Sequence, residues 1–342
     1  MKYCFSLIAL FFVLNVEAQL GGKGTYAFLN LHNSARSVAI GSNSISSIDN
    51  DLSVAWHNPA ALNSKMHNNV FVSYNNYISD INSGYFSYAR KFKDKGVWAA
   101  SLLYLDYGKF DGYLPNGLPT GTFTVKDQCL QLGYGHTLND KFSVGANAKY
   151  IYSIYESYVS NGLALDLSGI YNDTANQLTI TAFAKNAGFQ AIPYSGTKRQ
   201  PLPFELSIAI GKRLKYLPFR YNLVIHDLQK PDMRYSYATN EKDEAGNVRV
   251  KKVGMGDNIL RHLTLGGELN FTKNFVFRFG YNHMRRKEVS PDQKRGTAGF
   301  SWGLGFKISK FNISYGSASL FPGYNMNQFS LMCHLSDFYK KK

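Results

Sequence analysis

The sequence of 342 residues has few cysteines, few acidic residues and no long apolar run. Three cysteines are far too few for the disulfide framework that stabilises small secreted domains. After the N-terminal leader, no run of about 18 apolar residues occurs, which excludes a transmembrane helix. Asp and Glu total 23 against 38 Lys and Arg, a net charge of +15. Because the basic residues form no recognition motif, an anionic lipid surface is a better expected partner than nucleic acid.

Residues 1–18 have the organisation of a secretory signal peptide. Lys2 provides a positive start, an apolar run extends from Phe5 to Leu14, and small residues precede Gln19. Cys4 lies too early in this leader to be a lipid-attachment site. We therefore expect export with removal of residues 1–18, and no lipid anchor.

Aromatic residues and glycines are abundant, although the chain as a whole is not hydrophobic. It contains 24 Tyr, 24 Phe and 30 Gly, while its mean hydropathy is only −0.25. This combination suits a membrane β-barrel, whose strands are apolar on one face only and whose interfacial regions carry aromatic girdles. The roughly 320 residues after the leader could form two soluble domains, but no linker or change of composition divides them, so one large sheet is equally allowed.

Apolar and polar residues alternate almost everywhere after about residue 69. Between Phe142 and Ile154, the even positions are apolar, and most odd positions are serine, glycine, asparagine or lysine. Between Ala298 and Ile308, apolar residues alternate with glycine, serine and lysine. A period of two indicates strands with chemically different faces, here one for lipid and one for a polar interior. A soluble sandwich is the alternative, and it would bury the apolar face instead.

Fourteen segments have this alternation and predict an all-β fold, a transmembrane antiparallel β-barrel of about 14 strands. The predicted strands are 69–77, 82–93, 96–107, 122–138, 141–155, 157–172, 176–187, 203–215, 218–228, 261–271, 275–285, 297–309, 311–318 and 326–338. Short connections predict turns on the periplasmic side; they lie at 93–96, 139–141, 272–274 and 309–310. Longer connections predict extracellular loops; they lie at about 108–121, 188–202, 229–260 and 286–296.

Residues 19–68 do not follow the period of two. Small and polar residues dominate this segment, and its length suits a hatch that fills the lumen of a barrel of this width. Pro59 suits the first turn of a helix, with Asn58 as its cap. The chain is thus expected to comprise a leader (1–18), a hatch segment (19–68) and an outer-membrane barrel (69–342).

The hatch segment resembles the N-terminal hatch of the long-chain fatty-acid transporter (FadL) superfamily. The residues that carry the resemblance are Ser34, Ala35, Arg36, Asp49, Asp51, Asn58, Pro59, Ala60 and Leu62. The stretch from Gly24 to Leu29, which runs into Ser34, is similar to the PorQ group of barrels, relatives of PorV in the type IX secretion system. Ala61 follows the Asn-Pro-Ala motif where many relatives carry glycine, and this change is not expected to alter the hatch.

That resemblance implies a non-catalytic outer-membrane barrel that anchors or docks the cell-surface attachment complex. The implied partners are a PorZ-like surface protein together with PorU and PorV, which link secreted cargo to lipopolysaccharide. No cofactor is implied. The alternative, which the wider superfamily implies, is a FadL-like transporter of hydrophobic small molecules. Such a transporter would have a lateral opening or an apolar pocket lined by loop aromatics such as Tyr107, Phe110 and Tyr113.

Charged residues occur at strand positions whose parity places them toward the lumen. They are Lys149, Asp166, Lys185, Glu205, Glu268 and Arg278. Because an unpaired buried charge is costly, we expect these residues to pair with one another or with the hatch, for instance with Arg36. A polar route for a substrate is the alternative.

Candidates for catalysis or metal binding have weak patterns. Ser330 and His334 share one face of the last strand, but no nucleophile motif surrounds Ser330. His32, His57 and His67 lack the spacing of metal ligands. The adjacent pair of carboxylates in the hatch offers too few oxygen ligands for calcium. We therefore expect neither an enzyme nor a metal site.

Overall fold

The described part of the computed structural model covers residues 24–78, 80–92, 96–196, 198–234, 237–242, 248–251, 254–288 and 296–339. The expected signal peptide, residues 1–18, lies outside the described residues. None of the helices in the described ranges is long and apolar enough to cross a membrane.

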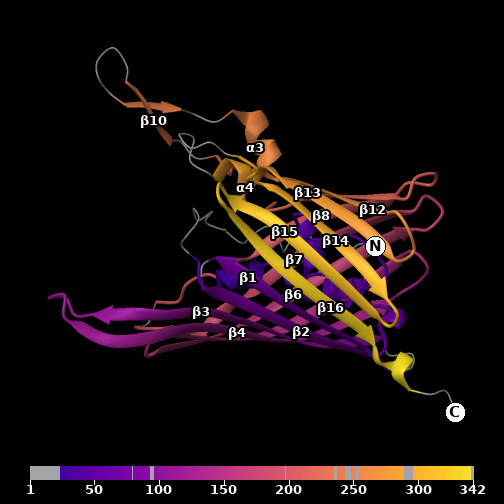
Figure 1. The fold of residues 1–342 in the computed structure, drawn as a ribbon, viewed down its shortest axis with the longest axis horizontal. Coiled ribbons are helices and arrows are strands. Elements are labelled where there is room, and N and C mark those ends of the chain that lie inside the picture. Colours follow the sequence, from indigo (N-terminus) through magenta and orange to yellow (C-terminus); the bar gives the residue numbers. More distant parts are fainter. Residues whose placement is uncertain are drawn as a thin grey trace, which may run out of the picture.

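Fourteen antiparallel strands close into a single barrel, and Figure 1 shows their arrangement. The barrel strands are β1 (Asn69–Ile78), β2 (Ile81–Lys91), β3 (Val97–Tyr113), β4 (Pro119–Thr137), β5 (Phe142–Tyr155), β6 (Tyr158–Asp173), β7 (Leu178–Ile192), β8 (Glu205–Arg213), β9 (Phe219–Ile225), β12 (Leu263–Asn270), β13 (Phe275–Asn282), β14 (Phe300–Ile308), β15 (Phe311–Phe321) and β16 (Tyr324–His334). β1 pairs with β16, with Phe71 opposite Met332, so the barrel has no free edge. The predicted fold class and strand number are therefore confirmed.

The outward face of the strands is apolar and the inward face is polar. In β5, Val144 and Tyr150 are 41% and 48% exposed, whereas Asn147 on the opposite face is fully buried. In β14, Trp302 is 45% exposed, whereas its neighbour Ser301 is buried. A soluble sandwich would show the reverse arrangement, so that alternative is wrong. Apolar side chains exposed all around a closed barrel require a lipid environment.

Short turns join neighbouring strands at one end of the barrel, which we call the short-turn end. Between β4 and β5, the Asn139 side chain accepts a hydrogen bond from the backbone N–H of Phe142 at 2.9 Å. Between β14 and β15, Ser309 has a φ of 54°, in the left-handed region that tight hairpin turns use. The opposite end, the long-loop end, carries α3 (Met255–Arg261) and α4 (His283–Glu288), as Figure 1 shows.

The loop predicted at 108–121 is mostly a hairpin in the structure. β3 continues to Tyr113 and β4 begins at Pro119, and together they project beyond the neighbouring strands (Figure 1). The prediction was wrong because a bulge interrupts the period of two. Gly108 has a φ of +85° there, and the register shifts while the pairing of the strands continues.

Two other predicted loops also contain regular structure. Within 229–260, β10 (Tyr237–Lys242) and β11 (Val248–Lys251) form a separate two-stranded sheet, and α3 follows them. Within 188–202, β7 continues as far as Ile192. The described parts of these two connections therefore contain more regular structure than their polar composition indicates.

The hatch, residues 24–68, lies inside the barrel, where Figure 1 shows it in indigo. Its short helices are η2 (Ala27–Asn30), α2 (Ala35–Ala39), η3 (Leu52–Trp56), η4 (Pro59–Ala61) and η5 (Ser64–Met66). Outside the hatch, η6 (Leu335–Phe338) follows β16. Leu29, Trp56 and Leu62 are at most 1% exposed and belong to one hydrophobic cluster with Ile151 of the wall. The lumen at this level is therefore filled with packed side chains.

Wall glycines let the hatch backbone approach the sheet. A Cβ on Gly145 of β5 would overlap the carbonyl group of Pro59, and a Cβ on Gly316 of β15 would overlap the carbonyl group of Ala35. A side chain at either position would push the hatch away from the wall. These two glycines, on the polar faces of their strands, thus have a packing role.

Candidate functional site

The short helix α2 of the hatch is fixed to the wall at both ends. Ser34 precedes it and accepts a hydrogen bond from the Ser37 N–H at 3.1 Å, which satisfies a donor that a helix start leaves free. Ser330 of β16 accepts a hydrogen bond from the Ala35 N–H at 2.9 Å. Ser301 of β14 donates to the last carbonyl of the helix at 2.9 Å. The wall serines therefore position the side chains that α2 presents.

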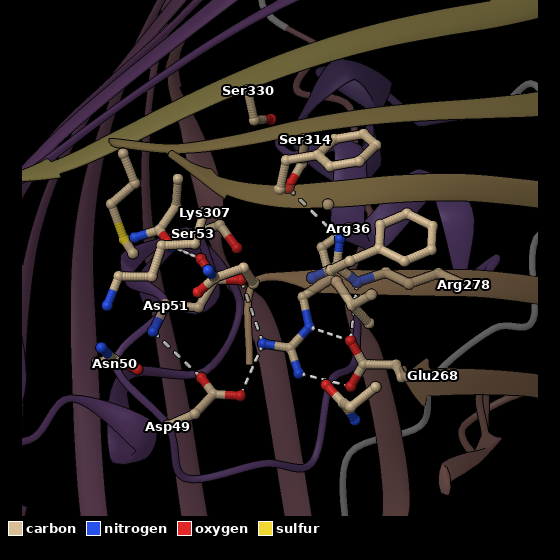
Figure 2. Close-up of a pocket in the computed structure, with 18 of the residues that line it drawn as sticks. Arg36, Asp49, Asn50, Asp51, Ser53, Glu268, Arg278, Lys307, Ser314 and Ser330 are labelled. Atoms are coloured by element: carbon tan, nitrogen blue, oxygen red, sulfur yellow. Dashed lines mark hydrogen bonds and ion pairs between the residues drawn. The ribbon is translucent and has the colours of Figure 1, made fainter. Parts of the chain in front are cut away.

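Arg36, on the same helix, projects into a group of carboxylates (Figure 2). Its Nε and Nη2 atoms donate to the two oxygens of Glu268 at 2.9 and 2.8 Å, the two-pronged geometry that favours arginine. Its Nη1 atom donates to Asp49 at 2.9 Å and to Asp51 at 3.2 Å. Arg36 is only 4% exposed, so these bonds form largely away from water. They join the helix, the hatch loop and the barrel wall.

Two arginines of the wall complete this arginine–carboxylate cluster. Arg278 donates to Glu268 at 2.9 Å, and Arg220 lies 3.1 Å from Asp49 and 3.5 Å from Glu268. Burial opposes the ionisation of Asp49, but the charges of Arg36 and Arg220 outweigh it and lower the pKa of Asp49. Burial also opposes the charge of Arg36, yet the carboxylates raise the pKa of Arg36. The cluster therefore stays ionised.

Two further ion pairs lie on the wall formed by β5 to β8. Lys149 and Asp166 pair at 2.6 Å, and both side chains are completely buried. The Lys149 ammonium also lies 4.9 Å from the centre of the Trp56 ring. Lys185 and Glu205 pair at 2.8 Å, and their side chains are 2% and 14% exposed. All six predicted lumen charges thus face inward, each in an ion pair.

Asp166 also closes a gap in the barrel wall. The register of β6 with β7 shifts between Leu165 and Leu167, and Asn186 has a φ of 56° at this point. The Asp166 carboxylate accepts a hydrogen bond from the Asn186 backbone N–H at 2.7 Å, in place of a ladder bond. Lys149 donates to the Asn186 side chain at 2.9 Å. Side chains, rather than backbone alone, join the two strands here.

The Asn-Pro-Ala motif contacts both the hatch and the wall. Pro59 begins η4, as expected. Asn58 makes no capping bond, because its side chain donates to the Ile45 carbonyl at 3.0 Å, so the predicted cap is wrong. The Ala60 N–H donates to the Ser168 hydroxyl of β6 at 2.9 Å. The motif thus connects two hatch segments and fixes them to the wall.

Polar wall residues that sequence reasoning missed also hold the hatch. Asn147 donates to the carbonyls of Ala55 and Trp56 at 3.2 and 3.1 Å. Gln131 donates to the same Ala55 carbonyl at 3.2 Å. Arg220, described above, is a third such residue. Their inward parity is the signal that could have found them, since it applies to every polar side chain of a strand.

The candidate catalytic and metal-binding residues are not brought together. Ser330 contacts the hatch helix, whereas His334 contacts Asp337 at 3.2 Å near the chain end. Among the described residues, no group of three or more His, Cys, Asp or Glu side chains is placed to hold a metal ion. His32 is buried and lies 3.3 Å from Arg285. Burial, and then the charge of Arg285, lower the pKa of His32 to about 3.

A polar cavity of about 350 Å³ borders the arginine–carboxylate cluster at the short-turn end (Figure 2). Hatch residues 49–51 and the ends of β12 to β15 contribute to its lining. Its lining includes the buried Arg36 and Arg278, and also Lys273 and Lys307, which are exposed at the strand ends. Its volume lies within the range of roughly 300–1,000 Å³ that is usual for ligand pockets.

No model of a protein family matches the chain, and no curated protein matches it by sequence. Similarity was found by comparison with solved structures.

Solved structures of outer-membrane channels are similar to this barrel. The toluene transporter TodX of Pseudomonas putida matches over 89% of this chain and 97% of that chain, with 12% identity and a TM-score of 0.54. The deltaS2 mutant of the TodX monoaromatic hydrocarbon channel matches over 87% and 96%, with 11% identity and a TM-score of 0.52. A FadL homologue of Pseudomonas aeruginosa, over 88% and 97%, has 11% identity and a TM-score of 0.49. The chain therefore has the fold of the TodX barrel.

Proposed function

We propose that this chain is a non-catalytic outer-membrane barrel that docks partner proteins at the cell surface. The observation that carries the proposal is the β3–β4 hairpin, which projects from the long-loop end (Figure 1). β3 and β4 have 17 and 19 residues. A tilted strand needs only about 9–11 residues to cross a bilayer. The outer part of the hairpin therefore stands in water.

Apolar side chains cover this part of the hairpin. Phe110, Tyr113, Leu114 and Leu118 are 41%, 64%, 47% and 57% exposed. The helix α3, at the same end, adds three more exposed apolar side chains, Met255, Ile259 and Leu260. Because apolar surface is costly in water, groups of this kind mark places that a partner covers.

The filled lumen supports docking rather than conduction. The hatch is bound to the wall through α2, through Arg36 and through the amide of Asn147. A continuous route through the lumen would require the hatch to leave these partners. Each buried charge that loses its partner costs several kcal/mol, roughly 3–5. A barrel whose lumen is closed in this way is suited to binding partners at its surface rather than to conducting molecules through its lumen.

The resemblance of the hatch segment to the PorQ group supports the type IX secretion system as the setting. In that setting the docked protein is PorZ-like, and PorU and PorV are the other members of the attachment complex that links cargo to lipopolysaccharide. The support comes from the N-terminal residues alone, and the structural comparisons do not bear on this role.

The test compares apolar groups at the two ends of the barrel. One variant replaces Tyr113, Leu114 and Leu118 by serine. The control replaces Tyr216 and Leu217, which are 88% and 59% exposed at the short-turn end. We expect the detergent-extracted wild type and control to retain the PorZ-like protein, and the hairpin variant to lose it. Recovery of a bare wild-type barrel, with secretion unchanged on deletion, would show that docking is wrong.

A FadL-like transporter of hydrophobic small molecules is the second candidate, and the structural comparisons support it better than the secretion role. TodX, whose fold the chain shares, is described as a toluene transporter. An apolar depression of about 500 Å³ on the outer wall, lined by Leu130, Leu163 and Phe189, offers a place for such a molecule. Of the expected pocket aromatics, Tyr107 donates to Asp127 at 2.7 Å, and the other two are exposed on the hairpin.

Uptake measurements separate the two candidates. Toluene and a long-chain fatty acid are supplied to cells with and without the chain. A transporter predicts slower uptake on deletion, and slower uptake when Ala187→Trp fills the depression. The control Ala100→Trp places the same bulk elsewhere on the outward face. Unchanged uptake in the deletion strain removes the transporter.

A further inference from the structure

The cavity at the short-turn end has an excess of positive charge. Its cationic lining residues are Arg36, Arg220, Lys273, Arg278 and Lys307, and its carboxylates are Asp49, Asp51 and Glu268. Five cations thus face three carboxylates, an excess of two. A concave site with low-dielectric walls concentrates such a field, so the cavity attracts anions.

The uncompensated charge lies at the two lysines. The carboxylates are already shared among the three arginines of the arginine–carboxylate cluster. Lys273 lies in the turn between β12 and β13, Lys307 lies near the end of β14, and both are exposed. Within the described ranges, no carboxylate oxygen lies within 4.0 Å of the Nζ atom of either lysine, so neither forms an ion pair. Two ammonium groups are therefore available to a ligand.

Amide and apolar side chains line the rest of the cavity. Asn270, Asn274 and Asn312 supply groups that both donate and accept hydrogen bonds. Val276 and Met332 add apolar surface. A peptide segment presents the matching set, because its backbone pairs with amides and its side chains include both carboxylates and apolar groups. A free inorganic anion would use only the charge.

We propose that this cavity binds an acidic peptide segment presented from the periplasm. The orientation follows from the short turns, which are expected on the periplasmic side. Carboxylates of the segment pair with Lys273 and Lys307, while its backbone contacts the asparagines. Binding in this cavity is separate from docking at the surface, because the cavity lies at the short-turn end, whereas the β3–β4 hairpin projects from the long-loop end (Figure 1).

The test uses the full chain in detergent and a fluorescent peptide of alternating glutamate and leucine. Fluorescence anisotropy at low salt measures its binding. We expect saturable binding that weakens roughly ten-fold or more in Lys273→Gln/Lys307→Gln, because two charge-assisted hydrogen bonds are lost. The control Lys109→Gln/Lys198→Gln removes the same charge from exposed positions at the long-loop end, and its affinity should equal the wild type.

Four results would overturn the proposal. They are an absence of saturable binding, equal weakening in both double variants, equal binding of a lysine–leucine peptide, and displacement of the peptide by inorganic phosphate at equal or lower concentration. The last result would assign the cavity to small anions. None of these four results would argue against docking through the hairpin, because both double variants leave the apolar side chains of the hairpin unchanged.

Discussion

The ion pairs on two sides of the lumen differ in their access to water. On the side of β5 and β6, Lys149 and Asp166 are both completely buried. On the side of β9 and β12, Asp49 and Arg220 are each 23% exposed and border the cavity. Water can solvate a charge that loses its partner on the second side but not on the first. The buried Lys149–Asp166 pair, which we call the dry pair, therefore has a structural role. The arginine–carboxylate cluster, which borders the cavity and which we call the wet cluster, is able to accept a ligand.

The largest expected effect comes from cutting the dry pair. Lys149→Met leaves the Asp166 carboxylate buried without its cation, which should lower the free energy of unfolding by about 3–5 kcal/mol. Lys149→Met/Asp166→Asn removes both charges and keeps an acceptor for the Asn186 N–H, so it should regain most of that loss. Urea unfolding of the barrel in lipid vesicles measures both. A single variant as stable as the wild type would break the comparison.

A smaller loss is expected in the wet cluster. Arg36→Met removes four hydrogen bonds to carboxylates. Glu268 and Asp49 keep Arg278 and Arg220 and gain water, so we expect a loss of about 2 kcal/mol in the same unfolding measurement. Added salt should change this loss little, because Arg36 and Glu268 are only 4% and 9% exposed and buried pairs are screened weakly. A loss greater than that of Lys149→Met would reverse the ranking of the two sides.

The control for Arg36 is a surface pair. Arg234 and Asp232 lie 2.7 Å apart, and their side chains are 34% and 55% exposed. Arg234→Met should leave the unfolding transition unchanged, because exposed pairs contribute little. A measurable change there would mean that the loss in Arg36→Met does not report on burial.

Glycine variants sharpen the same comparison through packing. A Cβ on Gly145, on the dry side, would overlap backbone atoms of Pro59. The atoms nearest to a Cβ on Gly305, at the cavity, belong to side chains, the first being Val276 Cγ1 at 2.6 Å. We expect Gly145→Ala to cost roughly 1–3 kcal/mol and to make the hatch easier to cleave with protease, whereas Gly305→Ala should cost less. Equal costs would mean that the hatch yields equally on both sides.

The barrel could be predicted because lipid and lumen impose opposite chemistry on successive residues, as between Phe142 and Ile154. The alternation of strand positions also predicted which charged side chains face the lumen. It failed at the β3–β4 hairpin, because the bulge at Gly108 shifts the parity while the strands stay paired. A local pattern cannot reveal a strand that continues past such a shift.

The partners within the site could not be predicted for a different reason. Arg36 and Glu268 are 232 positions apart, and their contact depends on how the hatch folds within the closed barrel. The hatch has no period, and its asparagines bond to distant carbonyls, as Asn58 does to Ile45. An arginine and an acidic wall residue were expected to pair, but choosing Glu268 among the wall carboxylates requires the three-dimensional structure.

The last prediction concerns the pH dependence of stability, because His32 and Asp49 titrate in different pH ranges. His32 has a pKa of about 3 in the fold against 6.5 for the free side chain, so the unfolded chain binds its proton more readily. Its contribution to stability is fully present above about pH 6.5 and is lost as the pH falls from there toward 3. The pKa of Asp49 is lowered from 3.8, so its contribution is lost only at more acidic pH.

Between pH 7.5 and pH 5.5, the His32 contribution to the free energy of unfolding should therefore fall by about 1.4 kcal/mol. His32→Gln removes the titrating group and should reduce the slope of stability against pH by this amount. Asp49→Asn lowers stability but should leave the slope in this interval unchanged, because Asp49 remains ionised throughout it. Unfolding in urea at the two pH values measures both slopes. A slope that follows Asp49 rather than His32 would mean that the wet cluster, and not the buried histidine, senses mild acid.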